Sequence, residues 1–167
     1  MNYTYLETPL GELLLAGNDE GLVYIGFPEG KGKVKPGDDW KLQKDYFTDA
    51  SIQLGEYFAG SRREFDLPLV PHGTPFQLEV LGALIEVPYG QTCTYKDIAI
   101  RIGREKAVRA VGAANGRNPL PIVIPCHRVI GTDGSLTGFG GGLVAKRFLL
   151  DLESRRGQGQ LSMELSA

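Results

Sequence analysis

The segment 118–129, which reads Asn-Pro-Leu-Pro-Ile-Val-Ile-Pro-Cys-His-Arg-Val, constrains the fold more than any other part of the chain. Each of its three prolines removes an amide donor and pushes the preceding residue toward extended geometry, so a helix is excluded here. The apolar run from Ile122 to Ile124 is expected to be buried. The sequence therefore predicts a rigid, buried strut that ends in a thiol next to an imidazole, Cys126 and His127.

Cys126 is a candidate nucleophile. The thiolate is the reactive form of cysteine, and a free thiol is only slightly ionised at neutral pH, so activation needs a base or a positive field. His127 is the obvious base, although adjacent side chains need not point at each other. A lone cysteine is more often a small buried hydrophobe, and the residues alone leave both interpretations open. Cys93 lacks an adjacent base and is interpreted as structural.

Length and composition exclude several classes of protein. A chain of 167 residues is one ordinary domain or two small ones. Two cysteines and two histidines make neither a disulfide framework nor a zinc spacing, so we expect no metal and no cofactor. No apolar run approaches the roughly 20 residues of a membrane-spanning helix, and the N-terminus lacks the features of a signal peptide. We expect a cytoplasmic monomer without a membrane partner.

Charge is distributed unevenly along the chain. Residues 1–71 hold 7 basic and 12 acidic residues, whereas residues 72–167 hold 11 basic and 8 acidic residues. The basic residues between positions 96 and 128 are Lys96, Arg101, Arg104, Lys106, Arg109, Arg117 and Arg128. An acidic half joined to a locally basic half suggests a polyanionic partner for the second half. A solvated charged face is an equally good interpretation of the charge alone.

The N-terminal half, residues 1–70, is predicted to be a scaffold. Residues 2–27 alternate apolar stretches with turn signals, which is typical of an antiparallel meander. Glycine and proline make 28–39 a loop, and apolar residues at helical spacing predict a helix that ends at Gly60. A short strand is expected at 65–68. No catalytic constellation is evident in this half.

The C-terminal half begins with a clearly marked helix. Thr74 is a good N-cap, Pro75 suits the first helical position and Gln77 completes a capping box. The linker residue His72 precedes it and is not expected to be a ligand. The buried face is predicted to consist of Phe76, Val80, Leu81, Leu84 and Ile85.

Two shorter helices follow and resemble a helix-turn-helix. Thr94 caps the first, with Asp97 at the box position, and Gly103 stops it. The second is predicted over 105–114 and is rich in alanine and glycine. Small residues permit close approach to another surface, but tight packing between helices explains their presence equally well. The helix-turn-helix pattern is weak by itself, but the basic window strengthens the case for DNA binding.

The last part of the chain combines a flexible loop with a final helix. Residues 136–142 are glycine-rich, but no Lys-Ser/Thr follows as a phosphate cradle would require, so a loop that closes over a flat ligand fits better. A helix is predicted over 143–153. Residues 156–167 are polar and are expected to form a flexible tail.

Pro125-Cys126-His127-Arg128, within this frame, resembles the active-site motif of the O6-alkylguanine-DNA alkyltransferases, also called methylated-DNA–protein-cysteine methyltransferases. The resemblance covers nearly all of 74–153 and is looser over the first 70 residues. It implies a mixed α/β fold, with a small antiparallel-sheet domain over 1–70 and a helical, winged-helix-like domain over 71–155. It also implies double-stranded DNA as the partner.

The resemblance implies single-turnover DNA repair with base flipping. The Cys126 thiolate would take the alkyl group from O6 of a flipped guanine irreversibly, and activity on O4-alkylthymine is left open. His127 would act on the cysteine through a water, and Glu153 would orient the imidazole. Tyr95 would donate to N3 of guanine, and Asn118 would help to order the site.

DNA contacts and a substrate pocket follow from the same resemblance. Arg109 would enter the base stack in place of the flipped nucleotide, and the third helix would enter the minor groove. The DNA-contacting residues expected are Thr94, Arg109, Ala110, Ala113, Ala114 and Arg128. The carbonyls of Cys126 and Val129 would accept from the guanine amine, and the Gly140 amide would lie near O6. Position 139 is Phe where many members carry Tyr, which indicates a roomy pocket.

Three other functions are possible for a chain with these motifs. A non-catalytic lesion-binding relative would lack the cysteine, so the intact motif argues against it. A helix-turn-helix transcription regulator that senses alkylation would need a further domain, for which this chain has no room. A cysteine hydrolase would turn over after the first equivalent, whereas an alkyltransferase would not.

Overall fold

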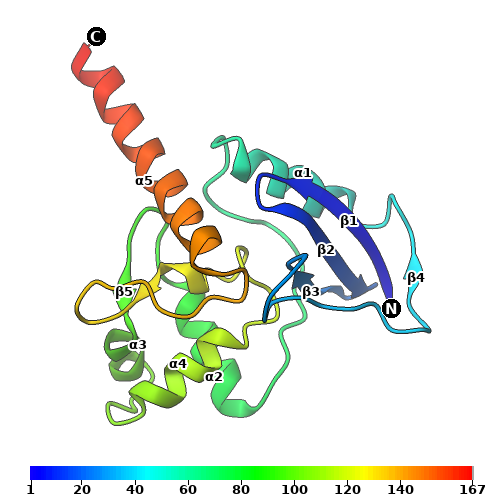
Figure 1. Cartoon of the computed structure of the whole chain (residues 1–167), viewed down its shortest axis with the longest axis horizontal. Helices are drawn as coiled ribbons and strands as arrows, with labels where there is room; N and C mark the ends of the chain where they lie inside the picture. The colour runs from blue at the N-terminus through cyan, green and yellow to red at the C-terminus, as the bar shows by residue number, and fades with distance from the viewer. Residues whose placement is uncertain (167) are drawn as a thin grey trace.

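The computed structural model describes the backbone of residues 1–166 and the side chains of residues 1–154. A sheet and its helix, drawn blue to cyan in Figure 1, lie on one side of the molecule. A group of helices, drawn green to yellow, lies on the other side, and the last helix rises between them. The mixed α/β fold predicted from the sequence is confirmed.

The N-terminal sheet is built from a predicted meander and one strand that was not predicted. β1 (Asn2–Thr8), β2 (Gly11–Asn18) and β3 (Gly21–Gly26) pair antiparallel in sequence order. β4 (Lys41–Leu42) adds to β1 in parallel, giving the order β3-β2-β1-β4. Two backbone hydrogen bonds hold β4 against β1: the Lys41 N–H donates to the Met1 carbonyl and the Gln43 N–H donates to the Tyr3 carbonyl, each over 2.9 Å. Two exposed residues leave no hydrophobic pattern by which a strand could be predicted.

α1 (Thr48–Phe58) packs against this sheet through a shared core. Leu54 and Tyr57 of α1 are fully buried in the same cluster as Leu13 and Leu15 of β2. The strand predicted at 65–68 is absent, so that expectation was wrong. The chain there makes only a bridge to β3, in which the Leu22 N–H donates to Pro68 and the Val70 N–H to Leu22. Proline lacks the amide that a continued ladder would need.

The helices of the C-terminal half begin mostly where capping residues predict. α2 (Pro75–Ile85) starts at a complete Thr74–Gln77 capping box, and α3 (Tyr95–Arg101) starts at a Thr94–Asp97 box. α4 (Val108–Gly116) starts three residues later than expected, because 104–107 forms a turn and Ala107 offers no side-chain cap. The inward assignment of Ile85 was also wrong, since it ends α2 and is 52% exposed.

The proline-rich segment is a tight turn and not an extended strut. The Ile124 N–H donates to the Leu120 carbonyl over 2.9 Å, and the Cys126 N–H donates to Ile124 over 2.8 Å. Ile122 adopts a left-handed backbone with φ of 76° while its side chain is 1% exposed. A β-branched residue held there costs about 1–3 kcal/mol, which the surrounding core must offset. The absence of an α-helix and the burial of the apolar run agree with the prediction.

Short elements then place the reactive residues. Cys126 opens the 3-10 helix η1 (Cys126–Arg128), which leads into β6 (Val129–Ile130). β6 pairs in parallel with β5 (Cys93–Thr94), so the start of α3 lies beside the residues that follow Cys126. This two-stranded pairing brings together two segments that are more than 30 positions apart in the sequence.

The final helix, α5 (Leu143–Ser166), runs past the predicted end at residue 153. In Figure 1 it carries the C-terminus away from the rest of the molecule. For the predicted flexible tail, 156–167, the side chains lie outside the described residues, and Ala167 lies outside them altogether. Among the helices of the described part, none combines the length and the apolar character needed to cross a bilayer.

Candidate active site and DNA-facing cavity

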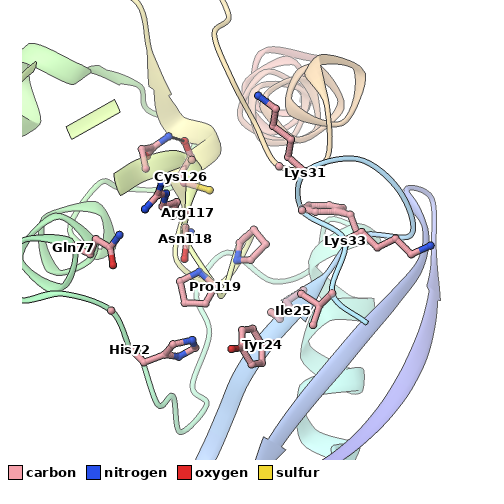
Figure 2. Close-up of a pocket in the computed structure, with 18 residues that line it drawn as sticks. Tyr24, Ile25, Lys31, Lys33, His72, Gln77, Arg117, Asn118, Pro119 and Cys126 are labelled. Atoms are coloured by element: carbon pink, nitrogen blue, oxygen red, sulfur yellow. Dashed lines mark hydrogen bonds between the residues drawn. The ribbon is translucent and has the colours of Figure 1, made fainter. Parts of the chain in front are cut away.

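Cys126 lies at the bottom of a cavity of about 260 Å³ between the two halves of the molecule. Its side chain is 3% exposed, and Figure 2 shows the sulfur pointing into this space. Burial raises the pKa of the thiol to about 11, and a hydrogen bond from Asn118 and the charge of Lys146 act in the opposite direction. The thiol is therefore protonated at rest at neutral pH and needs a base when it reacts.

His127 and Glu153 form a buried pair next to this thiol. The imidazole Nε2 lies 2.7 Å from Oε2 of Glu153, and both side chains are at most 2% exposed. Burial lowers the pKa of His127, so the ring is neutral at neutral pH. Because Nε2 faces a carboxylate, it carries the ring proton and donates it, which leaves Nδ1 as the acceptor. Nδ1 is buried and has no partner among the described residues, so it can take a proton.

Glu153 collects donors from several segments. Arg128 donates to it through Nε over 2.8 Å and through Nη2 over 3.0 Å. The Tyr57 hydroxyl donates over 2.6 Å and the Gly90 amide over 3.2 Å. Burial alone would raise the pKa of Glu153, but hydrogen bonds from His127 and Arg128 outweigh it and hold the pKa at about 2. The carboxylate is thus ionised and fixed in position.

Two residues expected to contact DNA lie in the interior instead. Arg128 is 6% exposed; besides Glu153, it donates through Nη1 to the Val87 carbonyl over 2.7 Å. Its guanidinium is consumed by these internal bonds and cannot reach a phosphate. Ala114 is 4% exposed and packs in the core. Both assignments to the DNA surface are corrected accordingly.

A buried lysine that the sequence analysis did not single out joins the walls of the site. Lys146 is fully buried, and Nζ donates to the Val129 carbonyl over 2.6 Å and to the Thr137 carbonyl over 2.8 Å. The Val129 carbonyl, expected to accept from guanine, thus already accepts one hydrogen bond and keeps its second lone pair. The Thr137 hydroxyl donates to the Tyr95 hydroxyl over 2.7 Å, so Tyr95 keeps its own proton to donate.

Two asparagines hold the turn that precedes the cysteine. Asn118 Nδ2 donates to the Ile124 carbonyl over 2.8 Å, and Asn118 Oδ1 accepts from the Leu120 amide over 3.0 Å. Asn115, which was not predicted, donates to the Cys126 carbonyl over 3.4 Å. Helical spacing places Asn115 one turn before the segment, but nothing in the pattern distinguishes it from a surface residue.

A larger cavity of about 1040 Å³ adjoins the first. Its walls come mainly from α4 and the glycine-rich loop, with Arg109, Ala113, Phe139 and Gly140, and are completed by Tyr95 of α3 and by residues 29–31. Arg109, Ala110 and Ala113 are exposed on α4, whereas the Thr94 hydroxyl is used as a helix cap. Of the predicted pocket and surface residues, Arg109, Ala113, Phe139 and Gly140 line this cavity. Within the described residues, no group of three or more His, Cys, Asp or Glu could hold a metal ion.

Family models match both halves of the chain. Residues 1–71 match the ribonuclease-like domain of 6-O-methylguanine DNA methyltransferase, and residues 75–155 match its DNA binding domain. The chain belongs to this methyltransferase family. The family recognised from the Pro-Cys-His-Arg motif is thereby confirmed.

Named methyltransferases resemble the chain over almost its whole length. A methylated-DNA–protein-cysteine methyltransferase of Methanosarcina barkeri is 53% identical over 153 residues, which cover 92% of this chain and 97% of that protein. The constitutive enzyme of Bacillus subtilis is 46% identical over 160 residues, which cover 90% of this chain and 94% of that protein. Mycobacterium tuberculosis OGT in complex with DNA superposes with a TM-score of 0.88 at 45% identity, covering 93% of this chain and 94% of the other.

Proposed function

We infer that this methyltransferase repairs alkylated DNA by moving the alkyl group from O6 of guanine to Sγ of Cys126, and that each molecule reacts once. Family membership supports the reaction class. The observation that supports Cys126 as the acceptor is its place: its thiol opens into a cavity, and the next residue is a neutral imidazole with a free Nδ1. A cytoplasmic location is proposed with it, supported by two unpaired cysteines and a DNA substrate.

The geometry supports a specific order of proton and bond changes. His127 Nδ1 takes the thiol proton, through a water, and Glu153 stabilises the imidazolium that forms. The Cys126 thiolate attacks the alkyl carbon in line, an S–C bond forms and the C–O6 bond breaks with its electron pair moving to guanine. Tyr95 transfers its hydroxyl proton to N3, so that guanine leaves as a neutral base, and the tyrosinate regains a proton as the His127 imidazolium gives up the one that it took from the thiol. The thioether product is not cleaved by water, so there is no second turnover.

The lesion must leave the base stack to reach the thiol, at a cost of a few kcal/mol. We assign the larger cavity to the flipped base, with Phe139 and Gly140 at its wall. Arg109 stands exposed at the same cavity and is the residue proposed to fill the gap in the stack. The exposed Ala110 and Ala113 leave room for α4 to approach a groove closely.

Intact-protein mass after mixing with duplex DNA that carries one O6-methylguanine tests this function. The wild type should gain one methyl group and saturate at one equivalent. Cys126→Ser should gain none while still binding the lesion DNA, and the matched control Cys93→Ser should behave as the wild type. Methylation of the Cys126→Ser protein, or more than one lesion repaired per molecule, would overturn the proposal.

A further inference from the structure

The N-terminal half sends one loop to the active-site opening. This loop, residues 27–33, is called the Lys31 loop below. Its backbone closes on itself, because the Phe27 N–H donates to Gly32 over 2.9 Å and the Lys33 N–H donates to Gly30 over 3.2 Å. Gly30 has a φ of 81°, a conformation that favours glycine. Backbone bonds thus fix the shape of the loop, and the Lys31 side chain contributes nothing to it.

The Lys31 loop is attached to the glycine-rich loop that forms the substrate pocket. The Gly32 N–H donates to the Gly140 carbonyl over 2.8 Å, and the Phe27 ring packs edge-on against Phe139 with centroids 5.3 Å apart. A Cβ at Gly32 would lie 2.8 Å from the Gly140 carbonyl, so only glycine permits this approach. These contacts hold the Lys31 loop in a fixed position beside the pocket, in addition to its attachment to the sheet.

Lys31 borders both cavities. It lines the larger cavity together with Arg109 of α4, and it also lines the smaller cavity that contains Cys126. In Figure 2 it stands across the smaller cavity from Cys126, whereas the amino group of Lys33 points away. Lys31 is exposed and forms no ion pair among the described residues.

The charge around the opening is mostly positive. Lys31 comes from the acidic N-terminal half, whereas Arg109 and Arg117 come from the basic C-terminal half. Of the residues that line the two cavities, only Glu29 is acidic. A flipped nucleotide in the larger cavity would have Arg109 and Lys31 at its walls, and its own phosphates would stay outside at the opening. A lysine is suited to this place, because its ammonium is a compact charge on a flexible stem.

We propose that Lys31 binds a phosphate of the lesion-carrying strand, so that the N-terminal half takes part in holding DNA from the side opposite α4. The contact goes beyond the proposed function, in which every residue that touches DNA comes from the C-terminal half. Neutralising one phosphate releases condensed counterions, so the contact adds to the salt dependence of binding and not to the chemistry of transfer.

The salt dependence of DNA affinity distinguishes a phosphate contact by Lys31 from a role in the chemistry or the fold. Binding of duplex DNA with one O6-methylguanine would be measured between 50 and 200 mM salt, with Lys31→Met and Lys35→Met each placed in the non-reacting Cys126→Ser protein. Lys35 is a matched control, because it is exposed four positions further along the chain and lines neither cavity. Transfer from free O6-methylguanine base would be measured for the same two substitutions with Cys126 intact.

Lys31→Met should make the slope of log affinity against log salt shallower by about 0.9. The loss of affinity between 50 and 200 mM salt should then be about threefold smaller than in the parent protein. Lys35→Met should keep the slope of the parent protein, and both variants should react with free base at the wild-type rate. An unchanged slope for Lys31→Met, or an equal change for Lys35→Met, would overturn the proposal. An equal loss of duplex binding and of transfer from free base would also overturn the proposal, because it would place Lys31 in the chemistry or the fold.

Discussion

A fully buried lysine, Lys146, lies beside the reactive thiol, and among the described residues its hydrogen-bond partners are backbone carbonyls alone. Burial lowers the pKa of Lys146, and the neighbouring Cys126 thiolate would raise it again. The Val129 and Thr137 carbonyl dipoles stabilise the ammonium without cancelling its charge. When Cys126 loses its proton, this charge is close enough to favour the thiolate in a medium of low dielectric constant. Lys146 is a positioning residue that also makes the local field positive.

Replacing Lys146 by methionine keeps an unbranched side chain and removes the charge. The pKa of Cys126 should then rise, and each unit of rise leaves about tenfold less thiolate at neutral pH. The pH dependence of iodoacetamide alkylation of Cys126 measures this directly. Lys146→Arg is the control that retains the charge. An alkylation profile of Lys146→Met that coincides with the wild type would contradict the electrostatic role.

At the scale of elements, the contact between α1 and α5 joins the two halves at the active site. Tyr57 of α1 donates to Glu153 of α5 over 2.6 Å and is fully buried. Burial, together with the negative charge of Glu153, raises the pKa of the Tyr57 hydroxyl, so it remains a donor at any ordinary pH. The N-terminal half therefore supplies one of the groups that fix the orienting carboxylate.

Tyr57→Phe should remove this donor without changing the shape of the core. A buried hydrogen bond to a charged group contributes about 1.5–3 kcal/mol, so the free energy of unfolding should fall by about that amount. Urea unfolding measures it. Tyr46→Phe is the matched control, because its hydroxyl bonds to Asp19 at the exposed surface and should change stability by less than about 0.5 kcal/mol. Equal effects of the two substitutions would contradict a special role for Tyr57.

Elements with local signals were predictable from the sequence, and those that depend on distant partners were not. The two capping boxes at Thr74 and Thr94 were found because a cap needs residues only three positions apart. The turn at 120–124 was mistaken for an extended strut, because Ile122 adopts a backbone that its residue type disfavours. Tertiary packing imposes that conformation, so no propensity could reveal it.

At the scale of the whole molecule, the buried carboxylate ties stability to pH. The pKa of Glu153 is about 2 in the folded protein, against an ordinary value of 4.5. A depressed pKa contributes stability that is fully present above the ordinary value and is lost as pH falls toward the folded value. The difference corresponds to roughly 3 kcal/mol.

The free energy of unfolding should therefore decline by roughly this amount between pH 4.5 and pH 2, beyond the decline that other carboxylates cause. Urea unfolding at a series of pH values, for the wild type and for Glu153→Gln, isolates the contribution. The variant should be less stable at pH 7, because Arg128 is left buried without its counter-ion. It should also lose stability less steeply in acid. Parallel pH curves for the two proteins would rule out Glu153 as the source.

The motif at residues 125–128 was enough to predict the family, and Tyr95, Arg109, Phe139 and Gly140, which the resemblance implies, line one cavity. Sequence reasoning placed Cys126, His127 and Glu153 correctly as neighbours only through the resemblance, since 26 positions separate the last two. It missed Tyr57 and Lys146, which look like ordinary members of helical faces. It placed Arg128 on the surface, because an arginine in a basic window gives no sign of an internal carboxylate partner.

The Tyr57–Glu153 contact spans 96 positions of the chain. A ribosome that has released residue 126 but not residue 153 therefore holds a chain whose histidine has no carboxylate to orient it. The thiol of such a chain has no imidazole held in place by Glu153 to take its proton. The active site is therefore complete only after the last helix has been synthesised and has packed against α1.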